Sequence, residues 1–224
     1  MTAQGPRVPA LHEHLRTVTY DAVVFMTYLY ATTAEGLPIV ADRSVLVPTV
    51  HDEPPLRLRI FDSVFASAQV LLFNTPEEQE LAERRFGTDP ARARIAGVGV
   101  SEPPRAEPER FRREASVRRP YALYVGRLDG SKGIDELLEN HARYRTAHRD
   151  GLDLALVGSG PLTVKPRRWL HTPGFVPEQL KHDALAGAAV VVVPSPYESL
   201  SMAQLEAWTH GRPTLANETS SRPT

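Results

Sequence analysis

Two cations five residues apart follow an apolar run and lie among glycines, a setting suited to binding phosphate. Tyr121–Val125 is the apolar run, Arg127 and Lys132 are the cations, and Lys132 is one of only three lysines in the 224-residue chain. Where a strand gives way to a helix, backbone N–H groups, the positive end of the helix dipole and such side chains face one point. The residues therefore indicate a diphosphate site. A solvated surface loop is the alternative for the two cations taken alone.

Two glutamates in the segment Pro194–Trp208 could contact the hydroxyl groups of a ligand. Glu198 precedes a predicted helix over about 200–210, and a simple capping role at the helix N-terminus is its alternative. Glu206 lies inside that helix with no Lys or Arg three or four positions away. A buried carboxylate needs hydrogen-bond donors, and vicinal ligand hydroxyls could supply them. We therefore expect Glu206 to lie on a largely apolar helix face without a local ion partner, where it could bind a ligand.

Two further patterns favour structural interpretations. Gly158-Ser-Gly160 resembles the start of a dinucleotide fingerprint, but the third glycine is missing and two prolines follow within six residues. We predict a tight turn after a buried strand there, and no nicotinamide site. His51-Asp52-Glu53 could ligate a metal ion, but no other histidine has suitable spacing, so we expect no metal. His51 is better interpreted as a loop histidine facing a cleft between lobes.

The segments that would position these residues alternate between strand and helix in both halves of the chain. Such alternation predicts parallel sheets with right-handed crossovers, in which ligands bind beyond the carboxyl ends of strands. Helices are predicted after Asn74, from Ile134 and over about 200–210. The predicted strands are Ala22–Met26, Ser44–Pro48, Gln69–Phe73, the weaker Arg94–Val100, Tyr121–Val125, Leu152–Val157, Ala189–Val193 and Thr214–Ala216.

A proline-rich and charged stretch separates the two halves. The chain has 20 prolines, and several of them cluster in residues 101–119, where apolar residues are few. Such a composition is typical of a linker. We therefore predict an N-terminal lobe over residues 1–100, a linker over 101–119 and a C-terminal lobe over 120–224.

Composition excludes several classes of protein. The net charge is −1 with no long run of one sign, which argues against nucleic-acid binding. The absence of cysteine excludes disulfides and thiolate metal sites. The longest wholly apolar stretch, Leu185–Pro194, is too short to cross a bilayer, which takes about 20 residues. We therefore expect a cytoplasmic protein without an integral membrane segment or an N-terminal signal peptide.

Several motifs together resemble those of retaining group 1 (family 4) glycosyltransferases. The match covers most of residues 20–217, in the same order and with similar spacing. The resemblance implies an α/β, GT-B-like fold of two Rossmann-like parallel-sheet lobes. The motifs are Val47–Pro54, Phe73–Glu78, Tyr124–Gly133, Val157–Pro161, Gly174–Val176 and Pro194–Ala207.

The resemblance also implies roles for individual residues. Arg127 and Lys132 would hold the donor diphosphate and stabilise the leaving group. Glu206 would bind the ribose hydroxyls. Glu198 would contact the donor sugar, which His51 would reach from across the cleft. The backbone of Leu200, Ser201 and Met202 would approach the sugar or phosphate.

The implied reaction transfers a sugar from a nucleotide-sugar donor with retention of anomeric configuration. No metal and no cofactor would be needed, since the nucleotide sugar is a co-substrate and the two cations replace a metal. The acceptor is not identified; a cell-surface glycan or a lipid-linked precursor is the class we expect, which would place the protein at the inner face of a membrane.

The chain departs from the family pattern at both ends. It begins inside the first lobe and stops at the start of a strand, and the tail Glu218–Thr224 is unlike the family's continuation. We expect both lobes to be incomplete, with exposed sheet edges and low stability, as in a gene product truncated or frameshifted near Asn217. The alternative function is accordingly a catalytically inactive remnant that at most binds nucleotide or a partner chain.

Overall fold

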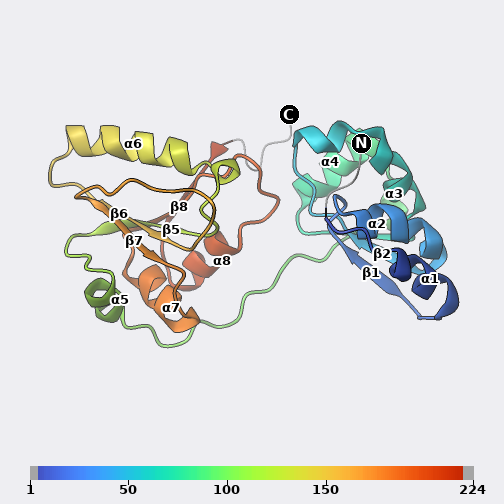
Figure 1. Cartoon of the computed structure of the whole chain (residues 1–224), viewed down its shortest axis with the longest axis horizontal. Coiled ribbons are helices and arrows are strands. Elements are labelled where there is room, and N and C mark those ends of the chain that lie inside the picture. Colours follow the sequence, from blue (N-terminus) through green and yellow to red (C-terminus); the bar gives the residue numbers. More distant parts are fainter. Residues whose placement is uncertain (1–4, 219–224) are drawn as a thin grey trace. The chain divides into compact units, whose positions relative to one another are not determined.

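The computed structural model describes residues 5–218, which form two compact units, residues 5–98 and 99–218 (Figure 1). Each unit has its own parallel sheet and its own buried core. The expected α/β fold with two parallel-sheet lobes is therefore confirmed. The tail that we expected to differ from the family's continuation lies, from residue 219 onward, outside the described residues.

The N-terminal unit is a four-stranded parallel sheet with helices packed on it. The strands lie in the order β1-β2-β3-β4, so each pairs with its neighbour in sequence. Tyr28, Phe61 and Phe65 are fully buried in its core, with the rings of Tyr28 and Phe61 edge to face at 4.8 Å. The elements are β1 (Val23–Met26), β2 (Ser44–Val47), β3 (Val70–Phe73), β4 (Ala93–Ile95), α1 (Pro9–Thr17), α2 (Ala31–Gly36), α3 (Asp62–Ser67), α4 (Pro76–Phe86), and the 3-10 segments η1 (Leu37–Arg43), η2 (Pro54–Arg57), η3 (Arg59–Phe61) and η4 (Pro90–Arg92).

β1 is an edge strand that exposes two large apolar side chains. Within residues 5–218 it pairs only with β2. Val24 is 58% and Met26 is 60% exposed, whereas Phe25 between them is buried, because successive strand side chains point to opposite faces. β1 is therefore an open edge of the sheet within residues 5–218, and a continuous buried core lies under the rest of the unit.

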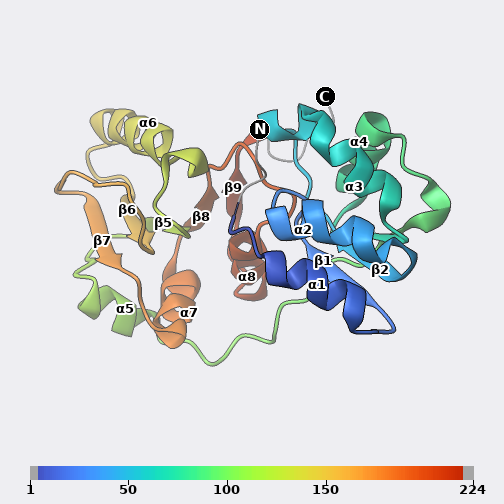
Figure 2. The same cartoon turned by 45° about the vertical axis from the view of Figure 1, so that its right-hand side comes forward.

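The C-terminal unit is a five-stranded parallel sheet in the order β7-β6-β5-β8-β9, with β9 beside β8 (Figure 2). Its central strand is the apolar run that the sequence singles out. Its elements are β5 (Tyr121–Val125), β6 (Asp153–Val157), β7 (Leu170–Gly174), β8 (Val190–Val193), β9 (Thr214–Ala216), α5 (Pro108–Glu114), α6 (Ile134–Ala147), α7 (Glu178–Gly187), α8 (Met202–Thr209) and the 3-10 segment η5 (Gly130–Lys132).

Both faces of this sheet are covered, as a parallel sheet requires. α6 lies on one side of the sheet, and α5, α7 and α8 lie on the other (Figures 1 and 2). Tyr121 and Leu123 of β5 belong to the core cluster with α5 and α7, whereas Ala122 and Tyr124 belong to the cluster with α6. Successive side chains of β5 thus point to opposite faces of the sheet and contribute to the hydrophobic core on each face.

Two elements of the C-terminal unit carry no clear signal in the sequence. β7 reads Leu-His-Thr-Pro-Gly, without an apolar run, and it is an edge strand paired only with β6 among the described residues. Proline is tolerated there because an edge strand leaves one row of backbone groups unpaired. α7 follows at once and buries Leu180, Ala184 and Leu185.

The stretch that we interpreted as a linker contains a folded helix. α5 begins at Pro108, whose missing N–H is no loss at the first helical position, and it buries Phe111 completely. Asp183 of α7, which is fully buried, accepts hydrogen bonds from Arg110 Nε and from the Glu107 N–H at 2.7 Å. The second half of residues 101–119 is therefore part of the C-terminal unit, because apolar burial and a charge pair fix it to α7.

We expect Asp183→Ala to lower the free energy of unfolding by about 2 kcal/mol, because the Glu107 N–H loses its acceptor beside a buried site. Urea unfolding followed by circular dichroism measures this change. Asp150→Ala is the matched control, since Asp150 pairs with Arg119 while its side chain is 93% exposed. Equal effects of the two substitutions would contradict the structural role of Asp183.

The same carboxylate predicts a pH dependence of stability. Burial opposes ionisation of Asp183, but the hydrogen bonds from Arg110, Glu107 and Gln179 outweigh it and hold its pKa below the usual value. A depressed folded-state pKa stabilises the protein above the unfolded-state pKa of about 4, and this contribution is lost as the pH falls through the folded-state value. We expect the wild-type unfolding midpoint to fall more steeply than that of Asp183→Ala on acidification below about pH 4.

Candidate functional site

The loop after β5 is built around Arg127 and Lys132. Tyr124 Oη donates a hydrogen bond to the Arg127 carbonyl at 2.8 Å. Asp129 caps η5 by accepting hydrogen bonds from the Ser131 N–H at 3.0 Å and from its hydroxyl at 2.9 Å. The loop that carries both cations is therefore fixed by its own side chains, and α6 starts directly after it.

Gly133 ends this loop in a left-handed conformation, with φ of 72°. A Cβ atom there would overlap the Pro194 carbonyl oxygen, so only glycine lets the loop after β5 approach the loop after β8 so closely. This approach brings Lys132 next to Glu198, with 3.3 Å between Nζ and Oε2. The two predicted site residues, 66 positions apart, are thus in contact.

Glu198 does not cap α8. The N-cap of α8 is Ser201, whose hydroxyl accepts from the Gln204 N–H at 3.4 Å. The first N–H groups of a helix have no partner within it, so the Met202 end of α8 presents free donors and a positive dipole.

The hydroxyl of Tyr124 stays protonated at neutral pH and therefore remains a donor. Burial, together with the charges of Glu198 and Asp129, raises the pKa of Tyr124 to about 12.

The Gly158-Ser-Gly160 turn packs against the loop after β5. The Leu128 N–H donates to the Ser159 carbonyl at 3.0 Å, and the Leu162 N–H donates to the Leu128 carbonyl at 3.1 Å. A Cβ atom on Gly158 would overlap the Gly126 carbonyl oxygen, and one on Gly160 would overlap that of Leu128. Both glycines are therefore needed for the two backbones to meet.

A pocket of about 370 Å³ opens between these two loops and α7. Arg127 lines it on one side and Lys181 on the other, and Phe175, which is 83% exposed, lies at its wall. Its other lining residues are Val125, Gly126, Val157, Gly158, Ser159, Val176 and Glu178. The pocket lies beyond the carboxyl ends of β5, β6 and β7, where parallel sheets bind ligands.

Glu206 has no ion partner within its own helix, as expected, but it has one on another helix. Lys181 Nζ lies 2.8 Å from Glu206 Oε1 and 2.7 Å from Glu178 Oε1. Burial alone would lower the pKa of Lys181, but its bonds to the two carboxylates raise it, so the lysine stays charged. The sequence could not show this pair, because the partner comes from α7, 25 residues before Glu206.

Four residues of this site were not predicted as functional: Lys181, Phe175, Tyr124 and Asp129. The scarcity of lysine that drew attention to Lys132 applies equally to Lys181 and could have identified it. Phe175 stands within the predicted Gly174–Val176 motif, but its exposure could not be read from residue types. Tyr124 and Asp129 act on the loop through local hydrogen bonds that the sequence alone does not reveal.

His51 belongs to the N-terminal unit, in a loop held by buried carboxylates. Its Nε2 lies 3.3 Å from Glu53 Oε2, and Tyr28 Oη donates to Glu53 Oε1 at 2.9 Å. Glu78, which is 3% exposed, accepts from the Val50 N–H at 2.6 Å, and burial raises its pKa. Burial opposes ionisation of Glu53, but hydrogen bonds from His51 and Tyr28 hold its pKa below the usual value. The loop is thus well fixed, and the role of His51 stays a prediction.

Two other kinds of feature are absent from the described part of the chain. In residues 5–218, no group of three or more His, Cys, Asp and Glu side chains is placed to hold a metal ion. The same part of the chain contains no helix that is both long and apolar enough to span a membrane.

Comparison with known proteins assigns this site to a family. A family model described as Glycosyl transferases group 1 matches residues 119–223, which include every site residue named above except those of the N-terminal unit. The D-inositol 3-phosphate glycosyltransferase of Geodermatophilus obscurus is 32% identical over 196 residues, which cover 75% of this chain and 42% of that protein. The chain therefore spans less than half the length of this relative.

Solved structures agree on the fold. The sucrose-phosphate synthase from Thermosynechococcus elongatus matches with a TM-score of 0.70 and 18% identity, over 90% of this chain and 57% of that chain. Anabaena HepE, in complex with UDP-glucose, matches with a TM-score of 0.71 and 15% identity, over 95% of this chain and 63% of that chain. At such identities the likeness concerns the fold alone.

We expect Gly158→Ala to lower the free energy of unfolding by about 2–3 kcal/mol, because the added methyl group overlaps the Gly126 carbonyl and forces the loops apart. Thermal and urea unfolding measure the change. Gly99→Ala is the control, since nothing lies within 4 Å of the added atom there and its φ is not positive. A Gly158→Ala protein as stable as Gly99→Ala would show that the close approach is not required.

Proposed function

The chain belongs to the group 1 glycosyltransferases with a GT-B fold, and we propose that it transfers a sugar from a nucleotide-sugar donor with retention of anomeric configuration. The observation that carries this proposal is the loop after β5, whose Arg127 lines the 370 Å³ pocket and whose Lys132 contacts Glu198. The name of the Geodermatophilus relative and the UDP-glucose bound to HepE support a sugar donor of this class.

In the proposed reaction, the two cations stabilise the departing diphosphate. Negative charge develops on the leaving oxygen as the glycosidic bond breaks, and positive groups fixed beside it lower the barrier. Among residues 5–218, Lys132 forms one ion pair, so its ammonium can exchange Glu198 for a phosphate oxygen. The N-terminus of α8, with the backbone of Leu200, Ser201 and Met202, adds N–H donors and a positive dipole on the same side.

Glu206 is proposed to bind the ribose. Its Oε1 accepts from Lys181, and among the described residues its Oε2 forms no hydrogen bond or ion pair, so it can accept from a hydroxyl group. Lys181 orients this carboxylate. The second oxygen of Glu206 therefore offers an acceptor beside Lys181, which lines the pocket.

The remaining assignments extend the same proposal. Glu198 contacts the donor sugar once Lys132 has turned to the diphosphate, and His51 supplies a further contact to that sugar.

Neither a metal nor an organic cofactor takes part in the proposed reaction, since Arg127 and Lys132 supply the positive charge. The acceptor is a cell-surface glycan or a lipid-linked precursor, reached from the cytoplasmic face of a membrane.

A second candidate function is nucleotide binding without transfer. The chain covers 42% of the Geodermatophilus relative, and β1 exposes the apolar side chains of Val24 and Met26. Donor binding needs only the C-terminal unit, whereas transfer also needs an acceptor site. The two functions are separated by measuring binding and turnover on the same protein.

We expect Lys132→Ala to weaken the binding of UDP at least tenfold, equivalent to about 1.4 kcal/mol, because a charge-assisted phosphate contact is lost. Isothermal titration calorimetry with UDP, GDP and ADP measures the affinities and identifies the base. Lys165→Ala is the matched control, because Lys165 is exposed and lies outside the pocket.

Release of glucose from UDP-glucose, or of mannose from GDP-mannose, decides between the candidate functions. Turnover by the wild type that is lost in Lys132→Ala supports the transferase, whereas tight binding without turnover supports the second candidate. The donor site itself is refuted if no nucleoside diphosphate binds, or if Lys132→Ala and Lys165→Ala behave alike.

A further inference from the structure

A second pocket lies at the opposite edge of the C-terminal sheet. Its volume is about 480 Å³, and it is formed where β5, β6 and β7 begin and α6 ends. This edge is the amino end of the strands, whereas the pocket that contains Arg127 and Lys181 lies at their carboxyl ends. The two pockets share no lining residue.

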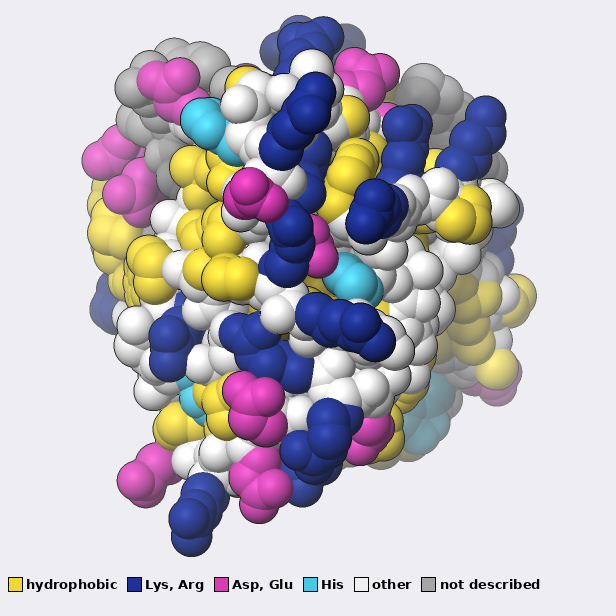
Figure 3. All heavy atoms as spheres, turned by 90° about the vertical axis from the view of Figure 1, so that its left-hand side faces the viewer, with side chains coloured by type: hydrophobic (Ala, Val, Ile, Leu, Met, Phe, Trp, Pro, Cys, Tyr) yellow, Lys and Arg dark blue, Asp and Glu magenta, His cyan; other side chains and the backbone are white. Residues whose placement is uncertain are grey.

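Arginine dominates the walls of this second pocket, which we call the arginine pocket. Five guanidinium groups and one carboxylate, Asp153, line it; the arginines are Arg119, Arg145, Arg149, Arg167 and Arg168. Figure 3 looks at this side of the molecule, where a band of Lys and Arg side chains runs down the middle of the face. Such an excess of positive charge in a concave site favours a ligand with several negative charges.

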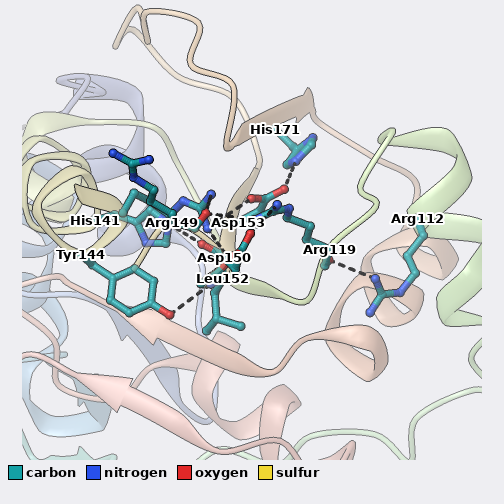
Figure 4. Close-up of polar contacts among 11 residues, drawn as sticks. Arg112, Arg119, His141, Tyr144, Arg149, Asp150, Leu152, Asp153 and His171 are labelled. Atoms are coloured by element: carbon teal, nitrogen blue, oxygen red, sulfur yellow. Dashed lines mark hydrogen bonds and ion pairs between the residues drawn. The ribbon is translucent and has the colours of Figure 1, made fainter. Parts of the chain in front are cut away.

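Two of the five arginines form hydrogen bonds to the loop between α6 and β6 and so hold one side of the pocket in place. Arg145 donates to the Gly151 carbonyl and, at 2.7 Å, to the Arg149 carbonyl. Arg119 donates to the same Arg149 carbonyl at 3.1 Å and to Asp150 at 3.0 Å, as Figure 4 shows. These bonds satisfy the carbonyls that follow α6 and fix the loop that leads into β6.

The single carboxylate of the lining is already neutralised. Asp153 accepts from His171 at 3.1 Å and lies 4.0 Å from Arg145 (Figure 4). It is 6% exposed. Asp153 thus pairs with Arg145 and Asp150 with Arg119, so within residues 5–218 three of the five lining arginines have no ion partner and the pocket keeps a surplus of positive charge.

The other three arginines have guanidinium groups available for a ligand. Within residues 5–218, those of Arg149, Arg167 and Arg168 form no hydrogen bond and no ion pair. Arg145 adds a buried Nε that has no hydrogen-bond partner, on a side chain that is 13% exposed. A buried donor of this kind costs free energy unless a ligand or water satisfies it.

Trp169 gives the arginine pocket an apolar wall. Its ring packs on His141 at 4.9 Å between centroids, and the Arg167 guanidinium lies over it at 6.0 Å. Pockets of about 300–1,000 Å³ suit small molecules, and guanidinium groups bind phosphate with paired hydrogen bonds. From these features we propose that the arginine pocket binds a small molecule that carries at least two phosphate groups, at a site separate from the sugar-donor site.

The experiment uses the two tryptophans of the chain, Trp169 and Trp208. In a Trp208→Phe background, Trp169 is the only tryptophan, so its fluorescence reports on the arginine pocket alone. Inorganic pyrophosphate is the probe, titrated at low salt in the presence of saturating UDP, which keeps the donor site occupied. We expect a saturable change in fluorescence whose midpoint rises with salt.

Arg149→Ala combined with Arg168→Ala is the test variant, because neither side chain supports the fold through a hydrogen bond or ion pair. We expect it to weaken pyrophosphate binding at least tenfold and to leave UDP binding unchanged. Arg16→Ala combined with Arg113→Ala is the control; it removes the same charge from exposed arginines outside the pocket and should change the midpoint less than twofold. Lys132→Ala should lower UDP affinity and leave the Trp169 signal intact when UDP is omitted, which separates this inference from the proposed function.

The inference is overturned if pyrophosphate does not change Trp169 fluorescence, or if the test and control variants lose the same affinity. Sedimentation with phosphatidylglycerol vesicles distinguishes a lipid source of phosphate from a free one. Vesicle binding that the test variant abolishes, without binding of pyrophosphate, would assign the pocket to a membrane and would overturn the small-molecule proposal.

Discussion

The donor side of this molecule depends on close contact between backbones. The carbonyls of Gly126 and Leu128 lie where any side chain on Gly158 or Gly160 would need to be, and Gly133 stands in the same relation to Pro194. These contacts replace side-chain packing with hydrogen bonds between loops, and they set the distance between the strand ends. The pocket at the carboxyl ends of the strands is bounded by loops whose backbones leave no room for a Cβ atom at Gly158.

Two lysines of the C-terminal unit are each paired with a glutamate from another element. Lys132 pairs with Glu198, and Lys181, which lines the pocket, pairs with Glu206. When a ligand oxygen replaces the glutamate, less conformational entropy is lost than when a mobile lysine side chain is ordered, because the ion pair already holds the lysine in place. The same arrangement explains why Glu206 can lie in an apolar helix face, where an unpaired carboxylate would be costly.

The sequence predicts a helix or strand where consecutive residues carry a strong local pattern. It predicts a part of the site where the residues of that part lie close together in the sequence. β5 was predicted at its observed bounds from five consecutive apolar residues, and the Arg127–Lys132 loop from its glycines. β7 was not, because an edge strand with a proline and no apolar run has no local signature. α5 was taken for linker because its anchor, Asp183, lies 73 residues from Arg110. The Lys181–Glu206 pair was missed for the same reason: contacts between distant segments are set by the fold, and residue types alone do not specify them.

The topology of the central strand has a consequence for the order of assembly. β5 pairs with β6 about one helix later in the chain, but its other neighbour, β8, is much further along, and Glu198 is 66 residues after Lys132. Contacts of such long sequence separation close slowly, because chain entropy must be lost before they form. During synthesis the loop after β5 emerges long before Pro194 and Glu198, so the chain passes through a stage in which one edge of β5 and the ammonium of Lys132 have partners that are not yet synthesised, whereas Arg127 already has Asp129.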